Sequence, residues 1–479
     1  MARLADHYSV GWRFQRATRI DHDSRDETAL DGFVLHATGR QIVDRLFDRL
    51  VNSQQRAFTW TGPYGSGKST LALFLSALLG GNIELRAAAR KRFGKRQLER
   101  LCSSLPEAGG NWLVLRIVGE KTDPHRAIAS ALRPALEEFF EGKVPRTLKK
   151  ELDPKSPREL LDILHRCAGK AAQRSGGLLM VIDEMGKFFD HAAEGKGDLH
   201  FFQELAEEFG RWDEVGLLVG ILHQSFQVYA GRLDRGRRDE WSKIQGRFED
   251  IPFTVTIEES LELIGRAISA KTLSKQAPKL AGKVVRALKS GRLKGYPELK
   301  DQLTRCYPLH PLSALILPPI SRERFGQNER SIFSFLSSGE PGGFKDFLLS
   351  TPDQPRACFA IDRLWDYLQL NLQQTILASP IGHKWSEVSE ALVRAESGGE
   401  THLRITKAVG LLDLFGRPFS LNATEDLILT AFPDLRAVEV KAALGDLAKW
   451  SVLVYRRHLG AWGITAGSDV DIDQEVEQA

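Results

Sequence analysis

One eight-residue stretch constrains the fold of this chain more than any other feature. It reads "GPYGSGKS" and runs from Gly62 to Ser69. It matches the pattern G-x-x-x-x-G-K-[ST], in which glycines let backbone N–H groups turn inward and surround phosphate oxygens. The pattern indicates a phosphate-binding loop only where it follows a strand and precedes a helix. That context is present, because a strand is predicted for "RAFTWTG" and a helix for "GKSTLALFLSALLG".

The pattern gives each polar residue of this loop an expected role. Lys68 is expected to reach the β- and γ-phosphates of a nucleotide, and Ser69 to bind Mg²⁺. Thr70 either contacts phosphate or packs locally. The predicted nucleotide-binding residues are Gly62, Pro63, Tyr64, Gly65, Ser66, Gly67, Lys68, Ser69 and Thr70. ATP and Mg²⁺ are therefore the expected ligands.

A second segment, "GLLMVIDEMGKFFD", supplies two carboxylates at the end of an apolar strand. Asp183 at the strand tip is suited to hold Mg²⁺ through its water shell. Glu184 follows directly and is suited to orient and deprotonate an attacking water. The alternative for Glu184 is an ordinary acidic loop residue. This Asp-Glu order is the hydrolytic arrangement of P-loop ATPases that have an additional central strand.

Short apolar strands alternate with helical patterns over the first half of the chain, which predicts a mostly parallel sheet covered by helices on both faces. After about residue 255 the strands are expected to stop until a terminal hairpin. The predicted fold class is a P-loop α/β sheet, then a helical lid and a C-terminal winged-helix-like module. The predicted parts are an N-terminal arm (1–35), an ATPase core (36–255) with an insertion around 84–175, a helical lid (256–345), and a helical segment plus winged-helix-like domain (346–479).

The strand "LLVGILHQSF" ends in His223 and Gln224, and here the chain resembles the AAA+ ATPases. In that family a polar residue at this position hydrogen-bonds the attacking water or the γ-phosphate. The resemblance assigns the role to Gln224, with His223 as the alternative. Its motifs are specific over residues 56–255, and it rests on pattern beyond them.

The same resemblance implies a role for an arginine between subunits. "IQGRFEDIPF" is similar to the segment that follows this strand in AAA+ proteins, where an arginine reaches a neighbouring subunit's nucleotide. Arg247 is the candidate, and a salt-bridged arginine at a strand start is the alternative. A second arginine directly before "GRF" is absent, which leaves catalysis between subunits open.

Two segments resemble parts of the lid in related ATPases. "GQNERSIFSFL" is similar to a lid helix of the initiator and origin-recognition ATPases, which implies that Arg330 contacts the γ-phosphate. "YPLHPLSALILPP" is similar to a segment of large origin-recognition-like ATPases of bacterial defence systems. His310 in that segment is either a nucleotide contact or a packed, helix-capping histidine.

The last 80 residues or so read as three helices and a hairpin, the element order of a winged helix. Arg456, Arg457 and His458 cluster at the turn of the hairpin, and contacts with DNA and with protein are equally open. The basic stretch from Ala89 to Arg100 is either a solvated helix face or a surface for nucleic acid or an acidic partner. The formal net charge of +4 is too small to decide between them.

Cysteine spacing and the distribution of apolar residues bear on the cellular compartment in which the protein is expected. The four cysteines form no C-x-x-C pair, which argues against a zinc knuckle. The first residues lack the apolar core of a secretory signal, and the apolar runs are too short to cross a bilayer. A cytoplasmic protein without a membrane partner is therefore expected.

These expectations combine into an ATP-hydrolysing, AAA+-like protein that couples nucleotide state to assembly or remodelling on double-stranded DNA, with a bacterial defence system as the suggested setting. Self-association or a partner protein is also expected. The alternative is a STAND-type switch, in which ATP/ADP exchange drives oligomerisation and activates a protein partner without nucleic acid.

Overall fold

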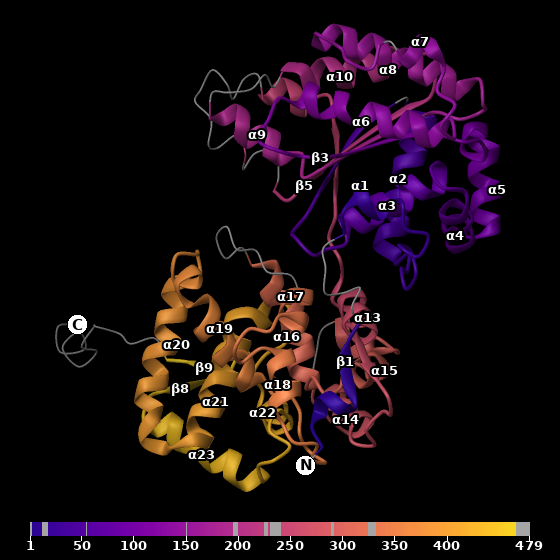
Figure 1. Ribbon diagram of the computed structural model, residues 1–479. Helices are drawn as coiled ribbons and strands as arrows, with labels where there is room; N and C mark the ends of the chain where they lie inside the picture. Colours follow the sequence, from indigo (N-terminus) through magenta and orange to yellow (C-terminus); the bar gives the residue numbers. More distant parts are fainter. Residues whose placement is uncertain are drawn as a thin grey trace, which may run out of the picture. The chain divides into compact units, whose positions relative to one another are not determined.

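The computed structural model describes residues 2–11, 18–53, 55–149, 151–194, 200–224, 229, 241–288, 292–323 and 332–465. The chain divides into two compact units (Figure 1). The first, Ala17–Val255, is here called the sheet body. The second, called the helical body, joins Met1–Arg16 to Thr256–Ala479. The predicted division of the second unit at residue 345 stays a prediction.

A five-stranded parallel sheet forms the centre of the sheet body, in the order β3-β4-β5-β2-β6. The strands are β2 (Ala57–Thr61), β3 (Leu113–Val118), β4 (Leu178–Asp183), β5 (Gly216–Leu222) and β6 (Glu249–Pro252). The strands predicted for "RAFTWTG", "GLLMVID" and "LLVGILH" are confirmed as β2, β4 and β5. β5 lies between β2 and β4, so the strand that ends in Asp183 is not the direct neighbour of the strand that precedes the phosphate-binding loop.

The register brings the ends of three strands to one edge. Thr61 of β2 lies opposite Leu222 of β5, and Gly220 of β5 lies opposite Ile182 of β4. Because the strands are parallel, the residues that follow each of them leave the sheet on the same side. The loop after β2, the acidic pair at the end of β4 and His223 after β5 therefore share this edge.

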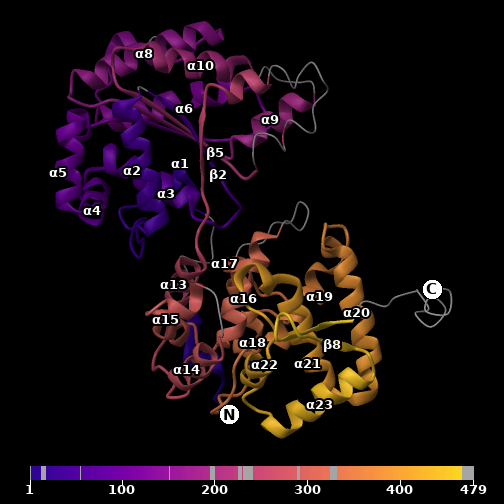
Figure 2. The same cartoon turned by 180° about the vertical axis from the view of Figure 1, so that it is seen from behind.

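Helices cover both faces of the sheet, as the run of apolar residues in each strand predicts (Figures 1 and 2). In β4, Met180 packs into the core on one face and Val181 into the core on the other. One layer holds α1 (Ile20–Asp23), α2 (Ala37–Asn52), α3 (Lys68–Leu79), α4 (Ile83–Phe93) and α5 (Lys95–Ser104). The other holds α6 (Pro124–Phe139), α7 (Arg146–Lys149), α8 (Pro157–Ala172), α9 (Gly186–Ala193) and α10 (His200–Arg211).

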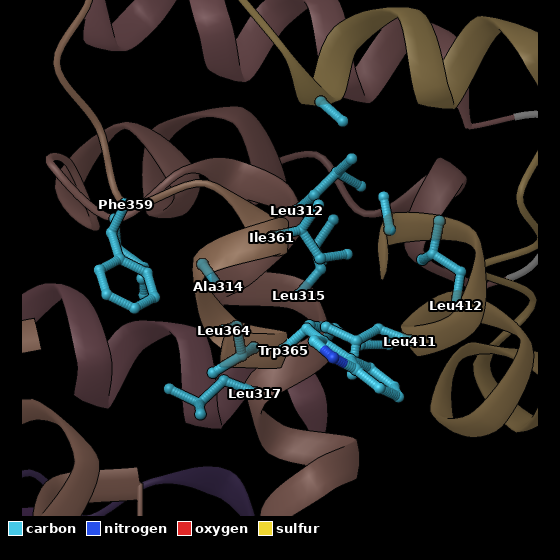
Figure 3. Close-up of a cluster of buried hydrophobic side chains, with 14 of the residues drawn as sticks. Leu312, Ala314, Leu315, Leu317, Phe359, Ile361, Leu364, Trp365, Leu411 and Leu412 are labelled. Carbon is cyan, nitrogen blue, oxygen red and sulfur yellow. The ribbon is translucent and has the colours of Figure 1, made fainter. Parts of the chain in front are cut away.

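The helical body is built around one apolar core (Figure 3). Leu312 and Leu315 of α16 share this core with Ile361 and Trp365 of α19 and with Leu411 of α21. Its helices are α13 (Ile257–Ala267), α14 (Ala277–Ala287), α15 (Leu299–Arg305), α16 (Pro311–Arg322), α17 (Ile332–Ser337), α18 (Phe344–Ser350), α19 (Ile361–Leu377), α20 (Gly382–Ala395), α21 (Glu400–Leu411), α22 (Glu425–Ala431) and α23 (Ala437–Lys449). In the described part of the chain, no helix has the length and apolarity needed to cross a membrane.

The expectation that strands stop after residue 255 is wrong at one place. β1 (Tyr8–Val10) pairs antiparallel with β7 (Ile268–Ala270). Tyr8 and Val10 are buried and Ser9 between them is exposed. This alternation is too short to stand out from the polar sequence around it, and its partner lies some 260 residues away, so only tertiary contact reveals it.

The end of the described chain has the predicted element order. α21, α22 and α23 precede a hairpin of β8 (Leu453–Arg456) and β9 (Ala461–Ile464). Asp413, just after α21, fixes the hairpin at both strands. Its carboxylate accepts hydrogen bonds from Nη1 of Arg456 at 2.7 Å and from the backbone N–H of Ile464 at 3.3 Å.

Candidate nucleotide-binding site

The predicted phosphate-binding loop, Gly62–Ser69, lies between β2 and the first turn of α3. Gly65 and Gly67 have φ values of 71° and 92°, the left-handed region that glycine occupies without steric cost. At Gly62, a Cβ would lie 2.4 Å from the carbonyl oxygen of Phe253, so a side chain is excluded there by close backbone approach. The loop leads into the N-terminus of α3, where no side chain caps the first N–H groups, and such a helix end favours an anion. The local geometry is therefore that of an anion-binding loop.

The ammonium group of Lys68 lies inside this loop. The residue is 3% exposed, and its Nζ donates to the carbonyl oxygens of Gly62 and Pro63, both at 2.6 Å. It also lies 3.3 Å from Oγ of Ser66. The loop carbonyls therefore provide hydrogen-bond acceptors for the buried ammonium group.

Ser69 at the start of α3 and Asp183 at the end of β4 lie near each other at this edge of the sheet. Burial raises the pKa of Asp183, while the Ser69 hydroxyl, the N–H of Glu184 and the charge of Lys68 act in the opposite direction. Hydroxyl and carboxylate oxygens are ligands that Mg²⁺ prefers. The described residues hold no group of three or more His, Cys, Asp or Glu side chains that could bind a metal alone, so phosphate and water would complete the Mg²⁺ shell.

Glu184 is held by an unusual backbone conformation. Its φ is 52°, in the left-handed region, and its N–H donates to Oδ1 of Asp183 at 2.9 Å. The backbone of Gly119 comes so close that a Cβ there would lie 2.2 Å from the Glu184 carbonyl oxygen. Such strain in a non-glycine residue persists only when the surroundings impose it, and it is enriched at functional sites. The conformation turns Glu184 away from the line of β4.

The Glu184 carboxylate forms an ion pair with Nζ of Lys187. This contact was not predicted from the sequence, although the spacing of three residues at the start of α9 could have indicated it. Lys187 also acts on the site electrostatically, since its charge is one cause of the lowered pKa of His223. Lys187 is therefore a further residue of the candidate site.

His223 directly follows β5 and contacts Tyr64 of the glycine-rich loop. Its ring stacks on that of Tyr64 with centroids 3.4 Å apart and 17° between the planes. Burial, together with Lys68 and Lys187, lowers the pKa of His223 to about 3, so the imidazole is neutral near neutral pH. Within the described residues, neither ring nitrogen of His223 has a hydrogen-bond partner, and neither does Oε1 of Gln224. Both remain candidates for contact with phosphate or water.

Arg247 lies away from the loop of its own chain. Glu249 of β6 is opposite Phe58 of β2, so Arg247 precedes the sheet at the end where the strands begin. Six strand positions at about 3.3 Å each separate that level from Gly62, roughly 20 Å. Arg247 pairs with Glu207 at 2.9 Å. Its action on a neighbouring subunit's nucleotide stays a prediction.

Both lid candidates come from the chain after residue 255. Arg330 lies outside the described residues. His310 is completely buried at the start of α16, where its Nδ1 accepts from the backbone N–H of Leu312 at 3.2 Å. Burial lowers the pKa of His310 to about 4. These contacts favour the capping interpretation of His310.

Thr70 contacts a residue from before α1, and its contact with phosphate stays a prediction. Its hydroxyl lies 3.1 Å from that of Thr18, which precedes α1. Thr18 is thus a neighbour of the phosphate-binding helix that the motif analysis did not identify.

Replacing Lys187 by Ala is expected to lower the turnover number for ATP about two- to five-fold, with KM within twofold. The reason is that an exposed ion pair of this kind contributes up to about 1 kcal/mol to the orientation of the Glu184 carboxylate. Steady-state phosphate release measures both constants. Lys187→Arg, which keeps the charge, is the matched control and should retain most of the turnover. A rise in turnover in Lys187→Ala would mean that Lys187 restrains Glu184 instead.

Comparisons with known proteins supply no argument about the activity of this chain. No family model and no curated protein matches the chain. Among solved structures, the chain is similar to the ORC2 protein of Aeropyrum pernix. The form with ADPNP and ADP is 12% identical, with a TM-score of 0.34 over 95% of this chain and 96% of that chain. The ADP form is 14% identical, with a TM-score of 0.35 over 93% and 92%. These values are too low to transfer a residue, ligand or activity.

The geometry of the sheet body itself is more informative. The strand order β3-β4-β5-β2-β6, the glycine-rich loop after β2 and the acidic pair at the end of β4 occur together in one body. The sheet body therefore has an α/β P-loop fold, in which a parallel sheet lies between two layers of helices.

Proposed function

We propose that this chain binds ATP with Mg²⁺ at Gly62–Thr70, hydrolyses it, and couples the nucleotide state to assembly or remodelling on double-stranded DNA. One observation carries the nucleotide part of this proposal. Ser69, at the start of α3, lies near enough to Asp183, at the end of β4, for its hydroxyl to lower the pKa of that carboxyl group, so the two side chains expected to hold Mg²⁺ are neighbours.

The proposed reaction divides the work among residues of the loop and of two strand ends. Loop N–H groups and Lys68 bind the phosphates and offset the charge that develops during transfer. Ser69 and Asp183 would hold Mg²⁺, which supplies further electrostatic stabilisation of the phosphate oxygens. Glu184 accepts a proton from the attacking water. A neutral His223 or the Gln224 amide orients that water or the γ-phosphate.

A DNA partner is proposed in part because of the C-terminal hairpin, whose element order is that of a winged helix. Its turn carries three basic residues, but Arg456 is hydrogen-bonded to Asp413. Arg457 and His458 are exposed at the turn and remain available to a phosphate backbone. The C-terminal hairpin therefore supports a DNA partner less strongly than its three basic residues indicate.

The second candidate function is the STAND-type switch that activates a protein partner. Two contacts on α23, the helix that would enter a DNA groove, favour it. Lys441 pairs with Glu425 at 2.9 Å, and Lys449 lies 3.6 Å from Asp446. Lysines paired with carboxylates are weaker phosphate contacts, so this helix is better suited to a protein surface.

The two candidates are separated by the rate of ATP hydrolysis with and without duplex DNA over a range of salt concentrations. The DNA-coupled function predicts that duplex DNA stimulates hydrolysis and is bound at low salt, with both effects declining as salt rises. If wild-type protein hydrolyses ATP but shows neither stimulation nor DNA binding at low salt, the STAND-type switch is favoured.

A further inference from the structure

We propose that the hairpin of helices α4 and α5 docks on the sugar-phosphate backbone of double-stranded DNA. The two helices meet at Gly94, whose φ of 103° lets the chain reverse between them. They lie at the outer edge of the sheet body in both views (Figures 1 and 2). The inference rests on the proposed DNA-coupled function and names the surface of the sheet body that would contact the duplex.

The hairpin concentrates positive charge. Residues 83–104 contain seven Lys or Arg and two Glu, a formal charge of +5, whereas the whole chain carries +4. The remainder of the chain is therefore close to neutral. A charge cluster of this kind produces a local field that a balanced total conceals.

Three of the seven cations anchor the hairpin to its own body. Arg86 donates to the side chain of Asn111. Arg90 donates to the carbonyl oxygens of Ala108 and Gly110, both at 3.1 Å. Arg92 donates to an α4 carbonyl and lies 3.6 Å from Asp31. These arginines have structural partners, so they are unsuited to an external ligand.

The other four cations face solvent. Lys95 is 91% exposed at its side chain, and its carboxylate neighbour Glu99 is 3.9 Å away, the outer limit of an ion pair. Lys91, Arg96 and Arg100 are exposed, and among the described residues they have neither an ion-pair nor a hydrogen-bond partner. Arg96 and Arg100 are one turn apart on α5 and share a face.

A regular polyanion fits this arrangement better than a small ligand. The free cations are exposed and spread along a helix and across a turn. Arginine forms bidentate hydrogen bonds with phosphate, and each lysine or arginine that neutralises a DNA phosphate releases a condensed counterion. Helices also contact DNA backbones without reading sequence. The hairpin is thus expected to add affinity that depends on salt and little on base sequence.

The test compares two triple variants of the full chain. Lys91→Gln/Arg96→Gln/Arg100→Gln removes the free hairpin cations. Arg133→Gln/Lys143→Gln/Arg146→Gln removes three exposed cations from the opposite layer, where Glu137 and Glu141 are interspersed with them. Both variants lose the same charge and should keep the DNA-independent rate of ATP hydrolysis, which serves as the control for folding.

Binding of a random-sequence duplex is measured by fluorescence anisotropy over a range of salt concentrations. For the hairpin variant, the slope of log K against log salt is expected to decrease by about 2 to 3, since each phosphate contact contributes about 0.9. At low salt its affinity should fall at least about tenfold, while the opposite-layer variant stays within about threefold of wild type.

Other outcomes separate the failure of this inference from that of the proposed function. If wild type binds DNA and both variants weaken it equally, or the hairpin variant binds as wild type does, the hairpin surface is refuted and DNA coupling stands. If wild type binds no duplex, DNA coupling and the hairpin inference both fail, while ATP hydrolysis is judged by its own rate. Hairpin-dependent binding to polyglutamate, with none to duplex, would replace DNA by an acidic protein.

Discussion

Replacing Glu184 by Gln is expected to lower the turnover number for ATP about 10²- to 10⁴-fold, the usual contribution of a general base. Gln keeps the size of the side chain and can hold water, but it cannot accept the proton. ATP binding should be retained, because the groups expected to bind phosphate and Mg²⁺ lie in the loop and at Asp183. Single-turnover phosphate release and the Kd for ATP, measured on the same protein, separate these two effects.

Glu204→Gln is the matched control, since it makes the same change in α10, where Glu204 lies 3.6 Å from His200. It should turn over ATP at the wild-type rate. If Glu184→Gln also retains wild-type turnover, Glu184 is an ordinary acidic residue and another group activates water.

Replacing Lys68 by Ala is the second change with a large expected effect, this time on binding. The affinity for ATP should fall about 10- to 100-fold, because a hydrogen bond to a charged group contributes about 1.5–3 kcal/mol. The loss also leaves the carbonyl oxygens of Gly62 and Pro63 without the ammonium donor that both share at 2.6 Å. Isothermal titration with ATP and Mg²⁺ measures the affinity.

The unfolding temperature should accompany this titration, since Lys68 is buried and its removal affects the loop itself. Lys68→Arg keeps the charge but not the shape, and it is expected to recover only part of the affinity. Wild-type ATP affinity in a folded Lys68→Ala protein would exclude the loop as the phosphate site.

The elements of the sheet body could be predicted because their signals are local. Each strand is a short apolar run, and the loop and the acidic pair are recognisable within a few residues. The order of the strands is not local. No pattern in the sequence indicates that β5 lies between β2 and β4, and that placement brings His223 to the same edge as the loop and Asp183.

Side-chain pairing could not be predicted from the sequence either, because the partners are far apart along the chain. The sequence places three basic residues at the turn between β8 and β9. Arg456, one of them, donates a hydrogen bond to Asp413, 43 residues earlier. In the basic stretch from Ala89 to Arg100, the sequence does not indicate that Arg90 is anchored, because the carbonyl oxygens that accept its hydrogen bonds belong to Ala108 and Gly110, 18 and 20 residues further along the chain. Charge patterns alone therefore overestimate the free positive charge at the β8–β9 turn. In residues 89–100 they do not separate anchored cations from free ones.

A structure of the full chain with a non-hydrolysable ATP analogue and Mg²⁺ would examine the proposed nucleotide site in a single experiment. We expect Nζ of Lys68 to leave the carbonyls of Gly62 and Pro63 and to lie about 3 Å from a β- or γ-phosphate oxygen. Ser69 should bind Mg²⁺ on the side that faces Asp183. Phosphates bound elsewhere, or a Lys68 that still contacts only the loop carbonyls with nucleotide present, would contradict the proposed ATPase site.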